Sequence, residues 1–254
     1  MSSSIVLQVS GVSKRFGGLQ ALSDVGITIE RGQVYGLIGP NGAGKTTFFN
    51  VITGLYTPDG GSFELGGEPY RPQAVHQVAK AGIARTFQNI RLFGNMTALE
   101  NVMVGRHVRT RAGVVGAMLQ NRATRDEEAA IRQRAIDLLH YVRIEDRADD
   151  LAKNLSYGDQ RRLEIARALA TEPRLLCLDE PAAGMNATET GDLRDLIDGI
   201  RRDGTTILLI EHDVKLVMGL CDRVAVLDYG ALVIEDVPAI VQKDQRVIEA
   251  YLGA

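Results

Sequence analysis

The stretch at residues 39–46 reads GPNGAGKT and directly follows the strand predicted at residues 33–38. It matches the pattern G-x-x-x-x-G-K-[ST], in which small residues let successive backbone N–H groups wrap around phosphate oxygens. The next residues, KTTFFNVITGL, predict an apolar helix, whose N-terminus favours bound anions. This order of strand, glycine loop and helix predicts the start of a parallel α/β core that carries a phosphate site.

The patterns on either side of this loop predict the rest of the organisation. Residues 5–9, 25–29 and 62–65 form short strands, and the first two alternate apolar and polar side chains as half-buried antiparallel strands do. Residues 97–147 are mainly helical and resemble a subdomain inserted into the core. The α/β pattern then resumes with the strand LLCL, a helix at 187–201, strands at 205–210 and in VAVL, and short helices at 238–252.

Composition limits the classes of protein to consider. With 254 residues, 45% of them hydrophobic and 24% charged, the chain is an ordinary globular protein. Its net charge of -3 gives no overall electrostatic footprint for nucleic acid, which we do not expect as a partner. Cys177 and Cys221 predict reduced, buried thiols. No apolar run approaches the roughly 18 residues of a membrane span, so we expect a cytosolic chain that reaches a membrane only through a partner.

A phosphate loop works with a magnesium ion, which needs a protein ligand outside the loop. The segment RLLCLDEP supplies a candidate for that ligand. Lys45 would reach the β- and γ-phosphates, and the Thr46 hydroxyl would bind Mg²⁺. Asp179, at the end of the buried strand, is the candidate for the other metal ligand. Glu180 follows it and could polarise the attacking water, whereas an isolated Asp-Glu pair would be a solvated strand end.

The segment LSYGDQRRLEIARALA contains a second candidate anion site. Ser156 is predicted to be a helix N-cap, and Gly158 leaves the first turn uncrowded. Taken alone, the segment would be an ordinary capped amphipathic helix. Two phosphate sites far apart in the sequence suggest that two chains share one nucleotide.

The ordered set GPNGAGKT, TFQ, LSYGDQ, LLCLDEP and IEHD resembles that of ABC-type ATPases, in particular the ATP-binding subunits of ABC transporters. The resemblance implies an α/β fold, with a phosphate-loop (RecA-like) ATPase core, an N-terminal antiparallel β subdomain and an inserted helical subdomain. All of residues 1–254 would form one ABC ATPase domain. Residues 1–95 and 171–254 would hold the β subdomain and the core, and residues 96–170 the helical subdomain.

The resemblance also implies the role of each site residue, with ATP and Mg²⁺ as cofactors. Glu180, His212, Lys45 and Gln88 would be catalytic, and Thr46, Gln88 and Asp179 would serve the metal. Phe16 would stack on adenine, and Ser156 and Gly158 would bind the ATP of the opposing subunit. The remaining nucleotide contacts would come from Gly39, Pro40, Asn41, Gly42, Ala43, Gly44, Lys45, Thr46 and Thr47.

Longer segments, among them ARTFQNIRLFGNMTALENVMVGRH and the ending VIEAYLGA, resemble the longer of the two ATPases of bacterial branched-chain amino acid importers. This implies a head-to-tail dimer, with itself or a paralogous ATPase, at the cytoplasmic face of the inner membrane. Two transmembrane permease subunits would bind it directly, and a periplasmic substrate-binding protein would act through them. The stretch at 106–125, with five arginines, is either a contact to membrane subunits or lipid headgroups or a solvated surface.

Four residues depart from the general ABC pattern, and several alternative functions are open. Tyr157 and Asp159 stand where Gly and Gln are usual, Asn186 stands where many ABC proteins have Asp, and Phe16 replaces the commoner Tyr. The cargo could also be urea, or a lipid or lipopolysaccharide for export. A soluble ABC protein of translation or DNA maintenance would need a second ATPase module or a long coiled coil. A kinase with the same phosphate loop is a further alternative, but LSYGDQ and His212 would then have no function.

Overall fold

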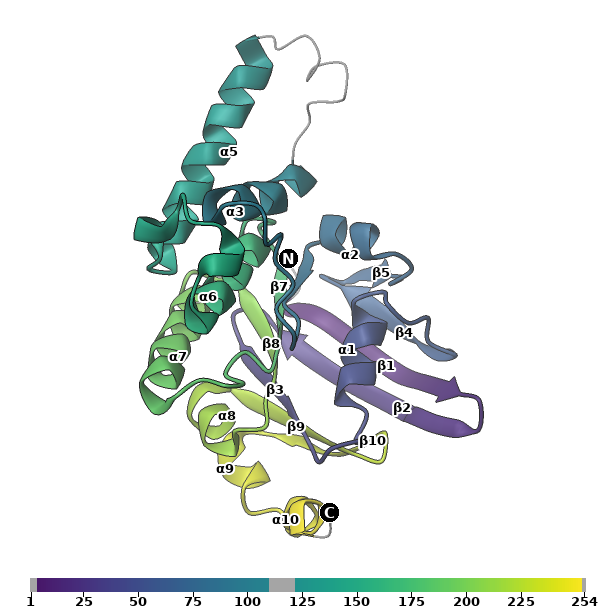
Figure 1. Ribbon diagram of the computed structural model, residues 1–254. Helices are drawn as coiled ribbons and strands as arrows, with labels where there is room; N and C mark the ends of the chain where they lie inside the picture. The colour runs from purple at the N-terminus through teal and green to yellow at the C-terminus, as the bar shows by residue number, and fades with distance from the viewer. Residues whose placement is uncertain (1–3, 110–121, 253–254) are drawn as a thin grey trace. The chain divides into compact units, whose positions relative to one another are not determined.

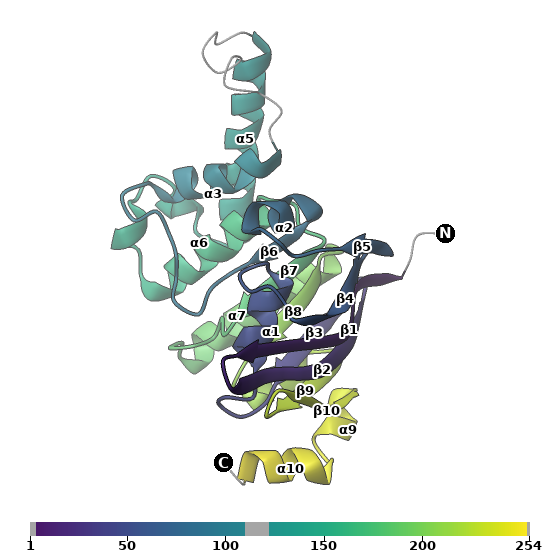
Figure 2. The same ribbon diagram turned by 90° about the vertical axis from the view of Figure 1, so that its right-hand side faces the viewer.

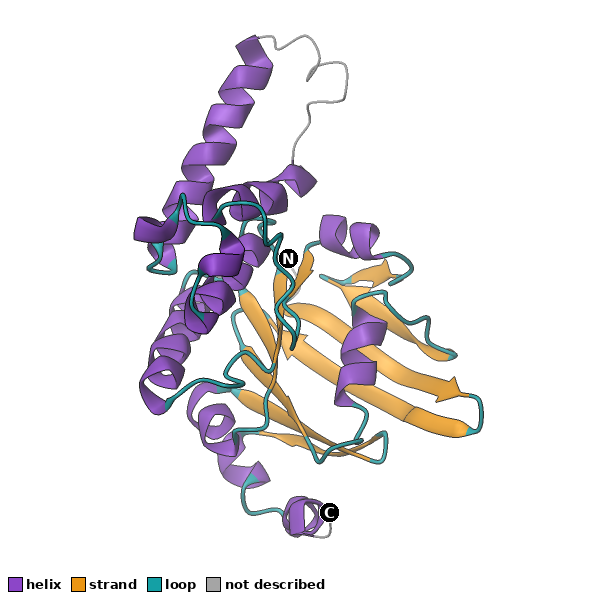
Figure 3. Cartoon of the chain, viewed as in Figure 1, coloured by secondary structure: helices purple, strands orange, loops and turns teal. Residues whose placement is uncertain are grey.

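The computed structural model describes residues 4–109 and 122–252, and these divide into two compact units. The core unit comprises Met1–Arg85 and Arg174–Ala254, and the helical unit comprises Thr86–Pro173. Within the two described ranges, no helix has both the length and the apolar character that crossing a membrane requires. Figure 3 shows the strands of the core unit in orange and the helices of both units in purple.

A four-stranded antiparallel sheet begins the core unit. Its order is β2-β1-β4-β5, with β1 Ile5–Phe16, β2 Leu19–Glu30, β4 Gly60–Leu65 and β5 Glu68–Tyr70. β1 lies between β2 and β4 and pairs antiparallel with both. The two long strands, purple in Figure 1, confirm the antiparallel β subdomain expected from their alternating side chains.

A six-stranded sheet forms the α/β core, in the order β10-β9-β3-β8-β7-β6. Its strands are β3 Val34–Ile38, β6 Ile83–Arg85, β7 Leu175–Asp179, β8 Thr206–Ile210, β9 Arg223–Asp228 and β10 Ala231–Asp236. All neighbours are parallel except β10 and β9. Every residue of β3, β7 and β8 is buried, as in strands covered on both faces.

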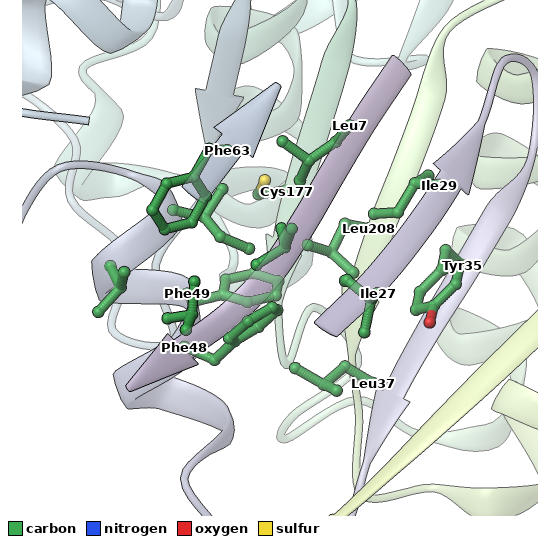
Figure 4. Close-up of a cluster of buried hydrophobic side chains, with 14 of the residues drawn as sticks. Leu7, Ile27, Ile29, Tyr35, Leu37, Phe48, Phe49, Phe63, Cys177 and Leu208 are labelled. Carbon is green, nitrogen blue, oxygen red and sulfur yellow. The ribbon is translucent and has the colours of Figure 1, made fainter. Parts of the chain in front are cut away.

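Six helices belong to the core unit in the described residues. They are α1 Lys45–Ile52, α2 Val75–Ala81, α7 Ala187–Arg202, α8 Val214–Leu220, α9 Pro238–Val241 and α10 Gln245–Leu252. The main hydrophobic cluster draws side chains from both sheets and from Phe48 and Phe49 of α1, as Figure 4 shows. Because α1 is anchored by two fully buried aromatic rings, the loop that precedes it has a fixed end.

In the part of the helical unit that the structure describes, three α-helices pack against one another. They are α3 Ala98–Arg106, α5 Arg122–Tyr141 and α6 Tyr157–Leu169, and short 3-10 turns lie at His107–Arg109, Glu145–Arg147 and Ala152–Asn154. α3 begins with a capping box in which Thr97 and Glu100 each accept a hydrogen bond from the other's backbone. In both Figure 1 and Figure 2, the first half of α5 extends beyond α3 and α6.

The structure confirms most of the expected elements, including the helix after the phosphate loop and the two short C-terminal helices. Both cysteines are free and buried, as predicted. The sequence patterns missed α2 and the short strands β5, β6 and β10, and β1 runs well past the expected residues 5–9. Most of the arginine-containing stretch at 106–125 lies outside the described residues, so its role stays a prediction.

Candidate active site

Three neighbouring parallel strands end at one edge of the six-stranded sheet, and each delivers site residues there. The phosphate loop follows β3, Asp179 and Glu180 end and follow β7, and Glu211 and His212 follow β8. The strand register places Leu37 and Asp179 on either side of Ile210. Ligands of open α/β sheets bind at the carboxyl ends of such strands. Segments far apart in the sequence therefore meet at one site.

The glycines of the phosphate loop are required by its backbone path. Gly39, Gly42 and Gly44 have φ angles of 148°, 82° and 99°, which side chains disfavour. A Cβ on Gly39 would lie 2.1 Å from the carbonyl oxygen of Leu227, and one on Gly44 would lie 2.7 Å from that of Ala21. The loop is thus pressed against the backbone of its neighbours on one side, while Asn41 and Gly42 are exposed on the other.

Lys45 begins α1, and its side chain curls back over the phosphate loop. The Nζ atom donates hydrogen bonds to the carbonyl oxygens of Gly39, at 2.7 Å, and Pro40, at 2.9 Å. Burial lowers the pKa of the Lys45 ammonium below its usual value, and the charges of Glu180 and Asp179 act in the opposite direction. The two carboxylates therefore help to keep a buried cation charged beside the loop.

The donor set fits a magnesium ion. Thr46 is exposed in the first turn of α1, and the Asp179 carboxylate is buried at the end of β7. Hydroxyl and carboxylate oxygens are the hard ligands that Mg²⁺ takes together with water and phosphate oxygens. Asp179 Oδ2 also accepts a 2.7 Å hydrogen bond from Arg85, so the carboxylate is held by a neighbouring cation.

Glu180 and His212 are brought together by the adjacent strands β7 and β8. The Oε1 atom of Glu180 lies 2.6 Å from Nε2 of His212. Glu180 has a φ of 48°, which is unusual for a residue with a side chain, and its N–H donates to the Ile210 carbonyl oxygen at 2.9 Å. The arrangement places a carboxylate and an imidazole in direct contact, as a general base and the group that orients it require.

Glu211 is a site residue that the sequence patterns missed. Its side chain is buried, and its two oxygens accept hydrogen bonds from the N–H groups of Ala182, at 2.7 Å, and His212, at 3.1 Å. Burial raises the pKa of Glu211 above its usual value, although these N–H groups favour the charged form. A carboxylate between a mostly apolar strand and a candidate catalytic histidine was the available signal.

Phe16 lies at the end of β1 and is 41% exposed, so it is not a core aromatic. Its ring meets that of Tyr56 edge to face at a centroid distance of 5.1 Å, and the Lys14 ammonium lies 5.4 Å from its centre. An exposed aromatic surface of this kind is suited to stacking on a planar ligand. Its role toward adenine stays a prediction.

In the helical unit, Ser156 is the N-cap of α6, as predicted. Its Oγ atom accepts a hydrogen bond from the Asp159 N–H at 3.2 Å and donates one to the Asp159 carboxylate at 2.8 Å. Asp159, which replaces the usual Gln, therefore completes the cap. Asn186 also has a local structural role, because it forms a capping box with Glu189 at the start of α7 in the core unit.

Side chains of α6 also form hydrogen bonds with the segment at residues 87–91, which contains Gln88. Arg161 donates hydrogen bonds to the carbonyl oxygens of Phe87, at 2.6 Å, and Gln88, at 2.9 Å. Glu164, paired with Arg161 at 2.9 Å, accepts from the N–H groups of Phe87 and Arg91. Gln88 is thus tied through its backbone to the helix that Ser156 caps. The structure places Gln88, Ser156 and Gly158 in the helical unit and the other predicted site residues in the core unit.

Comparison with known proteins agrees with this geometry. The family model described as ABC transporter matches residues 22–183. The chain is 45% identical to the high-affinity branched-chain amino acid transport ATP-binding protein BraF of Pseudomonas aeruginosa, and the match covers 98% of both chains. It is 44% identical to the corresponding protein LivG of Escherichia coli, again over 98% of both. At 32% identity it is also similar to the lipopolysaccharide export system ATP-binding protein LptB of Haemophilus influenzae, with 98% of this chain and 97% of that one covered.

Solved structures show the same fold. The ADP conformation of MJ1267, an ATP-binding cassette of an ABC transporter, superposes with a TM-score of 0.86 at 30% identity, over 99% of this chain and 100% of that one. The chain therefore belongs to the ABC transporter family, as an ATP-binding protein and an ATPase. The expected α/β fold, with its antiparallel β subdomain and helical insertion, is confirmed.

Proposed function

We propose that this chain hydrolyses ATP to drive a bacterial importer of branched-chain amino acids. The observation that carries the proposal is the identity of 44–45%, over 98% of the chain, to two ATP-binding proteins of branched-chain amino acid transport. The relative that serves lipopolysaccharide export is only 32% identical. An ATPase subunit does not touch the cargo, so likeness of the whole sequence is what separates these two alternatives.

Within the core unit, we assign each site residue a role in phosphoryl transfer. The phosphate loop would hold the phosphates through its backbone N–H groups, with Lys45 adding charge at the β- and γ-phosphates. Thr46 and Asp179, with Gln88 from the helical unit, would serve Mg²⁺, which neutralises charge on the phosphate oxygens when bound. Phe16 would stack on the adenine ring.

Glu180 would accept a proton from water as the water oxygen attacks the γ-phosphorus. The bond from that phosphorus to the oxygen bridging the β-phosphate breaks, which releases phosphate and leaves the electron pair on ADP. His212, in contact with Glu180, would orient that carboxylate and contact the γ-phosphate. Catalysis of this reaction depends mainly on positioning and charge stabilisation, so the site needs all these groups held in place at once.

The dimer supplies the remaining contacts in this proposal. Ser156 and Gly158 of a second copy, or of a paralogous ATPase, would close over the γ-phosphate in a head-to-tail arrangement. The dimeric post-hydrolysis structure of the ATP-binding cassette MJ0796, bound to ADP and Pi, has a TM-score of 0.77 to this chain at 26% identity, over 91% of this chain and 98% of that one. Because each site would take groups from both chains, ATP binding would favour closure and hydrolysis would release it.

The remaining partners follow from the same proposal. The chain would lie at the cytoplasmic face of the inner membrane, bound to two transmembrane permease subunits. A periplasmic binding protein would deliver cargo to them. The entire chain would act as one ABC ATPase domain, in which the helical subdomain expected at residues 96–170 passes movement to the permeases.

The test is to express tagged Glu180→Gln protein in its native cell, solubilise the membranes with MgATP and identify the chains that co-purify. Two polytopic membrane proteins and a paralogous ATPase are expected, and their cognate binding protein should bind leucine, isoleucine or valine. Recovery of lipopolysaccharide export components, or only of ribosomal or DNA-associated proteins, would refute the importer. Purified Glu180→Gln protein should also dimerise when ATP is added.

A further inference from the structure

Arg85, the last residue of β6, joins two of the elements that build the nucleotide site. Its Nη2 atom donates to Asp179 Oδ2 on β7 at 2.7 Å. Its Nη1 atom donates to two side chains of the α1 region, Asn50 Oδ1 at 2.6 Å and Thr53 Oγ1 at 3.0 Å. The Arg85 side chain is 7% exposed and that of Asp179 is 5% exposed. One buried guanidinium therefore connects the metal-site carboxylate to the helix that follows the phosphate loop.

The guanidinium is suited to fixing relative positions. Its donors point in fixed directions within one plane, whereas a lysine ammonium acts as a point charge on a flexible stem. The acceptors Asn50, in the last turn of α1, and Thr53, its C-cap, are three residues apart and so lie on one side of the end of this helix. The plane is held further by the Phe49 ring, whose centre lies 5.5 Å from the guanidinium carbon. Asp179 can shift relative to α1 only if these contacts change together.

Stability alone does not account for this arrangement. Removing two charges from water is costly, and well-packed apolar residues often stabilise a fold as well as a buried ion pair does. An apolar residue in place of Arg85, however, would remove the 2.7 Å hydrogen bond that orients the Asp179 carboxylate. Groups that hydrogen-bond to metal ligands orient those ligands and tune the affinity of the site for the metal.

We propose that Arg85 is a positioning residue for the Mg²⁺ of the nucleotide site. It sets the place of the Asp179 carboxylate relative to Thr46, which is on the same helix as Asn50. The inference rests on the proposed function, in which Thr46 and Asp179 serve one metal ion. It assigns Arg85 no contact with the nucleotide, so its effect is confined to binding that depends on the metal.

The test is the Arg85→Lys variant, which keeps the charge but loses the planar fork. Calorimetry would measure ATP affinity with excess EDTA and with saturating Mg²⁺, alongside the melting temperature of the nucleotide-free protein. We expect the affinity gained from Mg²⁺ to fall about 10-fold or more, with the metal-free affinity within about twofold of the wild type. The Mg²⁺ concentration for half-maximal hydrolysis should rise by a similar factor.

Arg223→Lys is the matched control, because the Arg223 side chain pairs with Glu235 at 3.4 Å in the same unit and, within the described ranges, has no hydrogen bond or ion pair to a predicted site residue. Asn50→Ala, which removes one acceptor of Arg85, should lose part of the Mg²⁺-dependent gain. If Arg85→Lys does not fold, the Mg²⁺-dependent gain in ATP affinity of Asn50→Ala tests the inference instead.

Three results would contradict either the inference or the proposed function on which it rests. An unchanged gain from Mg²⁺ in Arg85→Lys would overturn the inference. Equal loss of affinity with and without metal would also overturn it, since that pattern indicates a general structural role. A wild-type protein that gains nothing from Mg²⁺ would instead overturn the metal assignment in the proposed function.

Discussion

Glu180 Oε1 and His212 Nε2 lie 2.6 Å apart, although the two residues follow different strands. The contact arises because β7 and β8 are parallel neighbours and the N–H of Glu180 continues their ladder to Ile210. The positive φ of Glu180 turns the chain sharply at this point. Unusual backbone conformations of this kind cluster at functional sites, where the surrounding structure holds them. The fold itself therefore brings the proposed base, Glu180, into contact with the histidine proposed to orient it.

The Glu180→Gln variant should bind ATP but not hydrolyse it. The amide has nearly the same shape as the carboxylate, so binding should stay within a few-fold of the wild type, but it cannot take the proton from water. We expect kcat to fall by about 10²- to 10⁴-fold, the usual contribution of a general base. Phosphate release and nucleotide affinity would be measured together. Glu68→Gln, an exposed change on β5, is the control, and turnover of Glu180→Gln at the wild-type rate would refute the assignment.

His212→Ala should lower kcat, and combining it with Glu180→Gln should cause little further loss. Groups that act as a unit show strongly non-additive effects, because the orienting residue has no role once the base is absent. The four proteins of this double-mutant cycle would be compared in steady-state hydrolysis. Additive losses would show that His212 acts independently of Glu180.

The site residues at the carboxyl ends of the strands were predictable from sequence because each lies at or just after the end of a hydrophobic strand or a glycine loop. Lys45 follows the loop after β3, Asp179 ends β7 and His212 lies two residues after β8, and all three strands are fully buried. Arg85 was not predictable. Its strand has only three residues, and its partners Asn50 and Asp179 come from distant parts of the chain. Such a contact depends on the strand order β8-β7-β6, which local patterns do not encode.

ATP binding should weaken at alkaline pH through Lys45. Burial lowers the pKa of this ammonium in the nucleotide-free protein, so it loses its proton below the usual lysine value. The neutral amine no longer attracts the phosphates, and ATP affinity should fall as the pH rises. Calorimetric titrations from neutral to alkaline pH would measure this, with Lys45→Met expected to bind weakly and without that dependence. A pH-independent affinity in the wild type would contradict the prediction.

Glu211 should make the fold less stable as the pH rises above the acidic range. Because its pKa is raised by burial, the native state holds the proton over a window in which the unfolded chain has lost it. In that window, between the unfolded and native pKa values, the free energy of unfolding decreases as the pH increases. Glu211→Gln removes this titration. Urea unfolding of both proteins across the window should show the wild type losing stability relative to the variant, and parallel pH curves would refute it.

Arg161→Leu should destabilise the protein and loosen the segment at residues 87–91. Arg161 and Glu164 are 0% and 1% exposed, so removing the guanidinium leaves a buried carboxylate without its cation. Breaking a buried pair from one side typically costs about 3–5 kcal/mol. Urea unfolding would measure the loss. Arg147→Leu is the control, because Arg147 is half exposed and pairs with Asp146 and Asp150 at the surface, where about 1 kcal/mol or less is expected.

The same variant tests whether α6 holds the Gln88 segment. Arg161 bonds the carbonyl oxygens of Phe87 and Gln88, so its loss should speed hydrogen exchange of the N–H groups at residues 87–91 more than elsewhere in the helical unit. Glu164 bonds the N–H groups of Phe87 and Arg91 directly, and Glu164→Gln should produce a similar local change. Uniform acceleration over the helical unit would mean that the pair only stabilises the fold. Selective acceleration would show that the helix capped by Ser156 and the Gln88 segment are held together by this pair.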